Sequence, residues 1–192
     1  MGICAVFLDA GYVERVLMAE HEGLRIDYGL LAKKMAGSDR LRAAFYYNCL
    51  PYLSDIPTVD EQLRYDKRRR FMDALSRIPQ FTIRLGELTV VQEAEGKRVF
   101  QQKRVDMMLG IDMVLLASKK KVTSVSLFSG DSDYVPVVQT VRSEGVRVTL
   151  WHGATTNRPS MDLARACDTK VELTSELVSE LLRLSLIHIS DG

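Results

Sequence analysis

The stretch ICAVFLDAG at residues 3–11 decides the fold class of this 192-residue chain. Six consecutive apolar residues, at 3–8, are typical of a strand buried on both faces of a parallel sheet, and Asp9-Ala10-Gly11 then forms a tight turn. A second buried strand is predicted from Ser124 to Phe128, and it stops at Ser129-Gly130-Asp131. Both segments therefore predict buried parallel strands that end in loops containing aspartate.

Strand and helix patterns alternate along the remainder of the chain. We predict helices at 12–20, 28–35, 59–78, 105–118, 134–143, 161–166 and 175–184, and further strands at 41–48, 146–151 and 170–173. Such alternation produces βαβ units, so we expect one α/β domain over residues 1–184 with a mostly parallel sheet covered on both faces. Residues 185–192 are interpreted as a terminal extension outside the fold.

Residues 81–100 have a different pattern. Polar residues alternate with apolar ones there, and Glu95-Gly96 is typical of a turn. We therefore expect a strand followed by a small hairpin insertion at about residues 86–102.

Composition excludes several classes of protein. With 26 basic and 25 acidic residues, the net charge of +1 gives little long-range attraction to nucleic acid, so such binding would depend on local patches. The three cysteines, Cys4, Cys49 and Cys167, form no close pair, which favours reduced, buried thiols over zinc ligands or disulfides. The N-terminal stretch lacks a basic segment and no apolar run reaches the roughly 18 residues of a membrane span, so we expect a cytoplasmic protein.

Four aspartates are candidate metal ligands and catalytic residues. Asp9 follows the first strand, Asp131 and Asp133 follow the strand at 124–128, and Asp106 begins the helix at 105–118. Loops at the carboxyl ends of parallel strands share one edge of a sheet, where ligands bind if the strand order reverses. Mg²⁺ and Mn²⁺ prefer oxygen ligands, and a cation relieves the repulsion between crowded carboxylates. The pattern predicts a Mg²⁺ or Mn²⁺ site that activates water for attack on a phosphodiester.

Each of these aspartates also has a purely structural interpretation. Asp9 and Asp133 each precede a helix and could cap it. Asp131 follows a glycine in a turn, and Asp106 could complement the dipole of its helix. Asp112 falls on the apolar stripe of the helix at 105–118, where it would either support the metal ligands from behind or accept a structural hydrogen bond.

Three motifs resemble the NYN-domain family of PIN-like nucleases, and the LabA-type branch in particular. They are FLDAGY at 7–12, KRVD at 103–106 continuing through GIDM at 110–113, and SGDSDYVP at 129–136. The resemblance covers about residues 3–173, and SGDSDYVP is its most specific part. One departure is Tyr12, because many relatives carry an asparagine shortly after the first aspartate.

This resemblance implies a PIN-like three-layer sandwich around about five parallel strands, with the first strand and the strand after Lys121 adjacent at the centre. It also implies metal-dependent cleavage of RNA, with Asp9, Asp106 and Asp131 as metal ligands and Asp133 close by. Ser129 and Ser132, which belong to the same motif, are expected to support these carboxylates.

A nuclease also needs cations that hold the phosphate backbone outside the metal centre. Lys103 and Arg104 flank Asp106 and are candidates for the scissile phosphate. Arg64, Lys67 and Arg68 lie on the helix at 59–78, where Tyr65 and Phe71 could stack on bases. The alternatives are a solvated helix face with Phe71 in the core and, for Lys119-Lys120-Lys121, a solvated helix end. We expect His152 to be a loop or partly buried histidine.

The leading hypothesis is a metal-dependent endoribonuclease. One alternative is a phosphohydrolase, although Gly11 stands where haloacid-dehalogenase enzymes need a second aspartate. The other is a non-catalytic RNA-binding or regulatory module. RNA is the expected partner; DNA as the substrate and a homodimer stay open.

Overall fold

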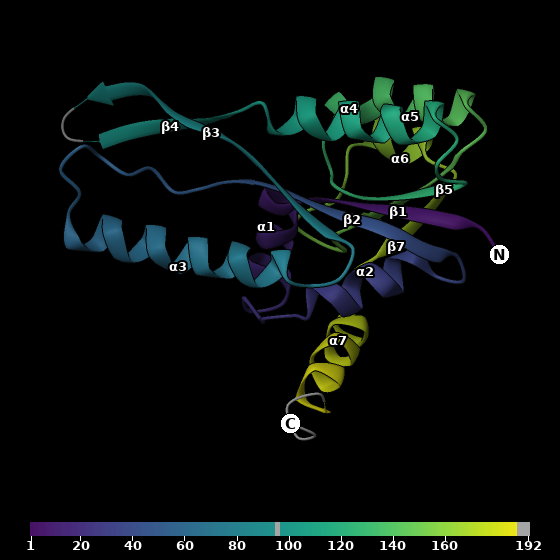
Figure 1. Ribbon diagram of the computed structural model, residues 1–192, viewed down its shortest axis with the longest axis horizontal. Helices are drawn as coiled ribbons and strands as arrows, with labels where there is room; N and C mark the ends of the chain where they lie inside the picture. The colour runs from purple at the N-terminus through teal and green to yellow at the C-terminus, as the bar shows by residue number, and fades with distance from the viewer. Residues whose placement is uncertain (95–96, 188–192) are drawn as a thin grey trace.

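The computed structural model describes residues 1–94 and 97–187 and shows a sheet between two layers of helices (Figure 1). The elements in chain order are β1 (Ile3–Asp9), α1 (Ala10–Glu20), α2 (Tyr28–Ala36), β2 (Arg40–Cys49), α3 (Val59–Ser76), β3 (Phe81–Ala94), β4 (Lys97–Lys103), α4 (Val105–Ser118), β5 (Ser124–Phe128), the 3-10 turn η1 (Ser132–Tyr134), α5 (Val135–Ser143), β6 (Arg147–His152), α6 (Met161–Ala166), β7 (Thr169–Glu172) and α7 (Ser175–Ile187).

The sheet confirms the predicted α/β class. Its strand order is β4-β3-β2-β1-β5-β6-β7, and the six strands from β3 to β7 all run parallel. This is one parallel strand more than the five or so that the resemblance implied. β1 and β5 are adjacent near the centre, as expected, with Phe7 opposite Leu127. β4 pairs antiparallel with β3, and the turn predicted at Glu95-Gly96 lies outside the described residues.

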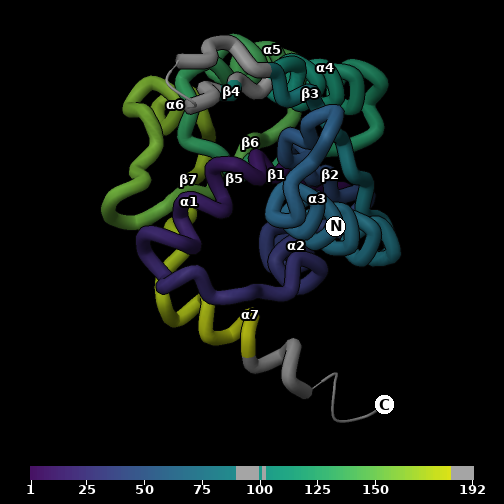
Figure 2. Tube along the Cα trace, turned by 90° about the vertical axis from the view of Figure 1, so that its left-hand side faces the viewer, coloured from purple at the N-terminus to yellow at the C-terminus, as the bar shows by residue number. Residues whose placement is uncertain are grey.

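Each face of the sheet has its own apolar core. Helices α1, α2 and α7 cover one face, which β1 meets with Cys4, Val6 and Leu8. Helices α4, α5 and α6 cover the other face, which β1 meets with Ala5 and Phe7. Successive side chains of a strand point to opposite faces of the sheet, which explains this alternation. Both sets of side chains in β1 are apolar because helices cover both faces. Figure 2 shows the two helix layers above and below the sheet.

Helix starts depend on capping side chains. The helix expected at 12–20 begins at Ala10, because Oδ1 of Asp9 accepts the Tyr12 N–H at 3.2 Å. A capping box of Thr58 and Glu61 begins α3. The helix expected at 134–143 begins at Val135, after η1, with Pro136 in its first turn, where no intrahelical N–H is required.

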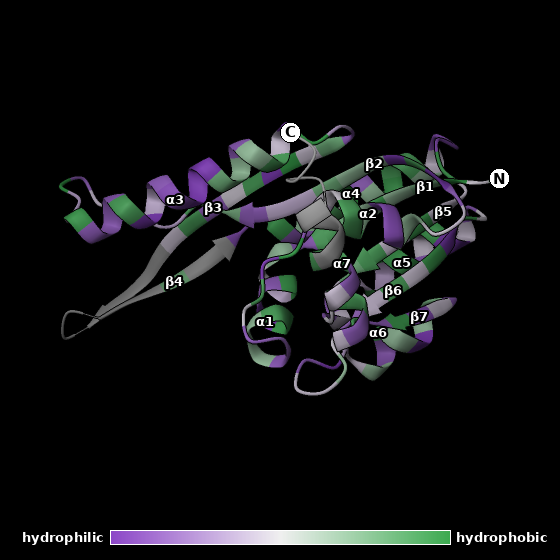
Figure 3. Ribbon diagram, turned by 90° about the horizontal axis from the view of Figure 1, so that it is seen from below, coloured by the Kyte–Doolittle hydropathy of each residue, from purple (hydrophilic) through white to green (hydrophobic). Residues whose placement is uncertain are grey.

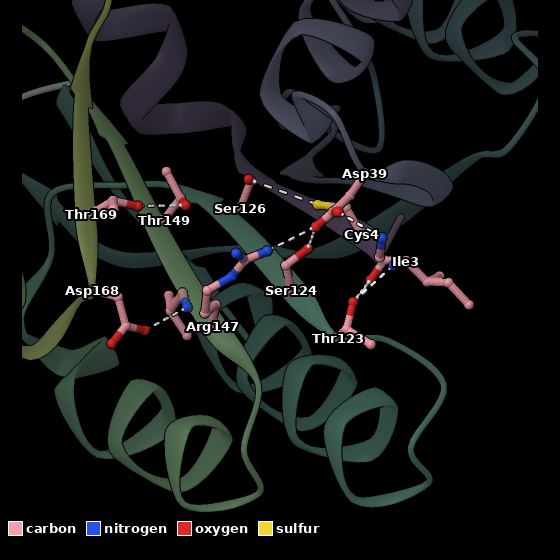
Figure 4. Close-up of polar contacts among 12 residues, drawn as sticks. Ile3, Cys4, Asp39, Thr123, Ser124, Ser126, Arg147, Thr149, Asp168 and Thr169 are labelled. Carbon is pink, nitrogen blue, oxygen red and sulfur yellow. Dashed lines mark hydrogen bonds and ion pairs between the residues drawn. The ribbon is translucent and has the colours of Figure 1, made fainter.

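The amino edge of the sheet is closed by polar contacts around Asp39 (Figure 4). Its carboxylate accepts hydrogen bonds from the Gly2 N–H at 2.8 Å, Ser124 Oγ at 2.6 Å and Arg147 Nη2 at 3.0 Å. The bond from Ser124 is the main cause that holds the pKa of Asp39 below its usual range, against the effect of burial. These contacts connect four segments of the chain at the amino edge.

One part of the fold extends away from the layers. Figures 1 and 3 show that α3 and the β3–β4 pair extend in the same direction, past the carboxyl ends of the other strands. All of α3 is described, and its buried residues are Met72 and Leu75, both in its last two turns. The three cysteines are free and buried. No helix in the described ranges combines the length and apolarity needed to cross a membrane.

Candidate active site

The sheet brings the predicted aspartates to one edge. From β1 the chain continues through α1 and α2 to β2 on one side, whereas β5 lies on the other side of β1. The strand order therefore reverses between β1 and β5, which is where open parallel sheets bind ligands. Asp9 is the last residue of β1, Asp131 and Asp133 follow β5, and Asp106 lies in the first turn of α4.

Asp9 is half-buried and held at both oxygens. Oδ1 accepts the Tyr12 N–H, and Oδ2 accepts the Ser129 hydroxyl at 2.9 Å. Burial raises the pKa of Asp9; hydrogen bonds from Tyr12 and Ser129 act against this, and the negative charge of Asp106 raises it further. Asp9 is thus a helix cap, as the structural interpretation has it. It is also an acidic group whose pKa is raised by the negative charge of Asp106.

The hydroxyl of Tyr134 lies among the carboxylates. Tyr134 is buried, and its hydroxyl donates to Oδ1 of Asp106 at 2.8 Å. Its pKa lies far above that of an ordinary tyrosine, first because of burial and then because of the negative charges of Asp9, Asp106 and Asp131. The Tyr134 hydroxyl thus contacts Asp106 directly, a role that sequence reasoning missed although Tyr134 belongs to the SGDSDYVP motif.

The loop after β5 is more open. Asp131, Ser132 and Asp133 are exposed, and Oδ1 of Asp131 accepts the Asp133 N–H at 3.0 Å, as in the turn-forming interpretation. Ser129 is buried against Asp9, which agrees with a supporting role for this serine.

The donor set at this edge is suited to a hard cation. Across residues 1–94 and 97–187, no three carboxylate, imidazole or thiol side chains stand close enough together to hold a metal ion as a group. Mg²⁺, however, usually takes one or two carboxylates and completes its octahedron with waters and phosphate oxygens. Asp9 and Asp106 offer only oxygen. Burial is the main reason why the pKa of Asp9 is raised, and the charge of Asp106 adds to it; a cation would offset both effects.

Asp112 has partners of its own in Tyr47 and Arg84. Its Oδ2 accepts hydrogen bonds from the buried Tyr47 hydroxyl at 2.8 Å and from Arg84 Nε at 3.1 Å. This is the structural hydrogen-bond role that the sequence offered as one alternative. His152 is likewise buried, with Nδ1 2.8 Å from the Gly153 carbonyl oxygen.

The candidate phosphate-binding cations have different surroundings. Lys103 and Lys67 are exposed. Arg104 forms an ion pair with Glu87, and Arg64 Nε lies 3.3 Å from Oδ2 of Asp60.

Phe71 is one of the two aromatic residues of α3 that were candidates for stacking on bases. Phe71 packs against Tyr28 and Tyr46, with ring centroids 5.7 and 6.0 Å away, so it belongs to the core and not to a base-stacking surface.

Arg68 belongs to a polar cluster that the sequence did not suggest. Its guanidinium forms two hydrogen bonds to Glu14 of α1, and the one from Nη2 to Oε2 measures 2.9 Å. The same carboxylate accepts the Tyr46 hydroxyl at 2.8 Å and Asn48 Nδ2 at 3.2 Å. These four residues come from α1, β2 and α3, so no local pattern connects them. The cluster anchors α3 to the carboxyl edge.

Tyr12 connects the site to the loop after β6. Its hydroxyl accepts the Gly153 N–H at 3.2 Å and donates to the Asn157 carbonyl oxygen. Its ring lies on Gly130, where a Cβ would stand 2.4 Å from Cε2 of Tyr12. The residue that departs from the expected asparagine thus holds two of the loops that border the aspartates.

Comparisons with known proteins agree with this architecture. The family model described as NYN domain matches residues 4–174. The uncharacterized protein y4oD of Sinorhizobium fredii (strain NBRC 101917 / NGR234) is 36% identical over 90 residues, a match that spans 46% of this chain and 42% of that protein. The crystal structure of a protein of unknown function, VPA0982 from Vibrio parahaemolyticus RIMD 2210633, superposes with a TM-score of 0.65, covering 91% of this chain and 94% of that chain. At 19% identity, this second likeness concerns the fold alone.

Proposed function

The chain belongs to the NYN domain family, a nuclease family of the PIN-like type, and from this membership we propose that it is a metal-dependent endoribonuclease of the LabA-type branch. The observation that carries the proposal is the arrangement of the carboxylates at this edge. Oδ2 of Asp9 at the end of β1 accepts the Ser129 hydroxyl from the loop that carries Asp131, and the Tyr134 hydroxyl donates to Oδ1 of Asp106. Such crowding of carboxylates is costly without a cation, and divalent metals are typical of this family.

We assign the metal to the edge that carries Asp9, Asp106 and Asp131, with Asp133 close by; one or two of these carboxylates would bind the ion directly and the others through water. Bound Mg²⁺ or Mn²⁺ would supply charge stabilisation at the phosphate and a more acidic water. The protein's own contribution is orientation: the Ser129 hydroxyl holds Asp9, and the Tyr134 hydroxyl holds Asp106. A residue that fixes a ligand in this way reduces the reorganisation needed when substrate binds.

Lys103 is the cation we assign to the phosphate backbone of the RNA. It is exposed and lies three residues before Asp106, at the end of β4. Arg104 adopts a left-handed backbone conformation with φ of 73° just before α4. The chain therefore turns sharply at Arg104, between Lys103 and the helix that carries Asp106. A point charge on a flexible stem suits contact with phosphate and carries no sequence preference.

The test is cleavage of labelled single-stranded RNA with Mn²⁺, in parallel with EDTA and with Asp131→Asn. The matched control is Asp162→Asn, which alters an exposed aspartate of α6. Loss of a metal ligand should lower the rate by at least about a hundredfold, whereas the control should cleave normally. Circular dichroism of each variant checks that it is folded.

Three other outcomes would contradict the proposal in different ways. Cleavage that survives in Asp131→Asn indicates a contaminant or a different site. Failure to cleave any of several RNAs, with RNA still bound, indicates a non-catalytic RNA-binding module. Cleavage of DNA in preference to RNA would change the substrate class but not the assignment of the site.

A further inference from the structure

An apolar groove begins at the candidate active site and runs between α4 and α5. It has a volume of about 560 Å³ and is lined by Asp106, Met107, Gly110, Ile111, Val114, Leu115, Asp133, Tyr134, Pro136, Val137 and Thr140. Met107, Ile111 and Leu115 are 70%, 50% and 42% exposed. Their spacing of four residues places them in one stripe along α4. Apolar stripes of this kind, when exposed, mark interaction surfaces.

A second exposed stripe lies on α3, which extends from the body of the molecule (Figures 1 and 3). Val59 and Leu63 are 79% and 59% exposed, and the exposed Lys67 continues the same spacing of four residues. The stripe is thus apolar at the free end of α3 and basic nearer the body.

The two stripes have the same length and complementary chemistry. From Val59 to Lys67 and from Met107 to Leu115 the distance is eight residues, or about 12 Å of helix. If α3 lies antiparallel to α4, Val59 meets Leu115 and Leu63 meets Ile111. Lys67 then reaches the end of the groove that carries Asp106 and Asp133. Two of the three facing pairs are apolar, and the third sets Lys67 opposite Met107, which is next to Asp106 in the chain and shares the groove lining with Asp106 and Asp133.

Within one molecule, the two stripes are kept apart. The buried residues of α3, Met72 and Leu75, belong to the core on the face of α1 and α2, whereas α4 and α5 cover the opposite face. The Glu14–Arg68 contact holds α3 on its side. A second copy of the chain is therefore the occupant that fits the groove. A two-fold arrangement lets each copy give its α3 and receive the other's.

We propose that the chain forms a two-fold dimer in which α3 of each copy lies along the α4–α5 groove of the other. In this dimer Lys67 is placed beside the carboxylates of the other copy, where it can hold the phosphate backbone of a substrate. The role of Lys67 in RNA binding rests on the proposed nuclease function. The dimer itself does not, because it follows from the two stripes alone.

Sedimentation velocity of the full chain, without metal or RNA, tests the dimer. We expect twice the 21.7 kDa mass of one chain. Leu63→Glu and Ile111→Glu each bury a carboxylate in the contact and should raise the dissociation constant at least about a hundredfold. Met18→Glu is the matched control, since Met18 is 72% exposed on α1 and outside both stripes. A monomer at about 100 μM, or a dimer that both stripe variants leave unchanged, overturns the proposal.

Disulfide cross-linking tests the pairing of residues. The native cysteines are buried, so Leu63→Cys with Ile111→Cys should give covalent dimers on mild oxidation, and Leu63→Cys with Met161→Cys should not. Equal cross-linking of the two pairs contradicts the antiparallel alignment. If Ile111→Glu leaves the mass unchanged but weakens RNA binding, the groove is a nucleotide-binding surface and the dimer is wrong.

Complementation tests the shared site. Lys67→Ala and Asp131→Asn should each cleave poorly, and their equimolar mixture should recover about a quarter of the wild-type rate, because half the dimers are mixed and one site in each is intact. No recovery from a mixture that is dimeric by mass places Lys67 in its own copy's site. If the wild-type chain does not cleave at all, the nuclease proposal fails, whereas the mass and cross-linking results still decide the dimer.

Discussion

Glu14→Ala should destabilise the protein more than a surface substitution does. Its carboxylate accepts hydrogen bonds from Tyr46, Asn48 and Arg68. Tyr46 is fully buried, so a hydroxyl without its acceptor costs about 1–3 kcal/mol. The side chains of Arg68 and Glu14 are 30% and 34% exposed, so their ion pair is intermediate between a surface pair and a buried one. Loss of this pair should add about 1–2 kcal/mol to the destabilisation. We expect a total of about 3 kcal/mol.

Urea unfolding followed by circular dichroism measures this loss, which corresponds to about 6–12 °C in melting temperature for a chain of this size. Glu14→Gln is the matched control, since it keeps an acceptor for Tyr46 and should lose only about 1–2 kcal/mol. Arg68→Ala should cost little once Glu14 is already alanine, because the interaction has gone.

A free energy of unfolding within about 0.5 kcal/mol of the wild type for Glu14→Ala would refute this reasoning. So would additivity of the Glu14 and Arg68 substitutions, since contacting residues should be coupled. In either case Arg68 would be available for the RNA contact that the sequence suggested for it. A large loss of stability would instead assign Arg68 to anchoring α3.

Two further predictions concern the loops beside the site. Burial acts to raise the pKa of Glu20, but hydrogen bonds from the N–H groups of Asn157, Thr155 and Ala154 outweigh it and hold the pKa below the ordinary 4.5. A group with a lowered folded-state pKa stabilises the protein above about pH 4.5, and this stabilisation is lost as the pH falls through the folded-state pKa. The free energies of unfolding of the wild type and Glu20→Gln should therefore converge in acid. A difference between them that does not depend on pH would contradict this prediction. Gly130→Ala places a Cβ 2.4 Å from Cε2 of Tyr12 and should lower the free energy of unfolding by about 1–3 kcal/mol, as measured by thermal melting. The control Gly11→Ala, whose Cβ has its nearest contacts at 3.6 Å, should lower it little. Equal effects of the two substitutions would show that Tyr12 moves freely.

Much of the fold could be predicted from local patterns. The uninterrupted apolar run of β1 and the run of β5 indicated strands buried on both faces, and both occupy the centre of the sheet. The four aspartates were predicted to share an edge because parallel strands present their carboxyl ends together. The structure has Asp9 at the end of β1, Asp131 just past β5 and Asp106 in the first turn of α4, while their assignment to a metal stays a proposal.

Contacts between distant segments could not be predicted in this way. Glu14 and Arg68 are 54 positions apart, and Tyr134 and Asp106 are 28 apart. Each residue alone is typical of a solvated helix face or a buried aromatic position. Its role depends on which partner the packing of helices against the sheet places next to it.

The sequence by itself determined the order of strands and helices, the two-sided burial of the central strands and the edge that carries the acidic loops, because these depend on residue periodicity and on neighbours in the chain. Only the tertiary structure decided that Arg68 binds Glu14, that Asp112 supports Tyr47 and that Tyr12 packs on Gly130. Hydrogen bonds and close packing are short-range in space, so they are set by the folded arrangement and leave no signal in the spacing of residues along the chain.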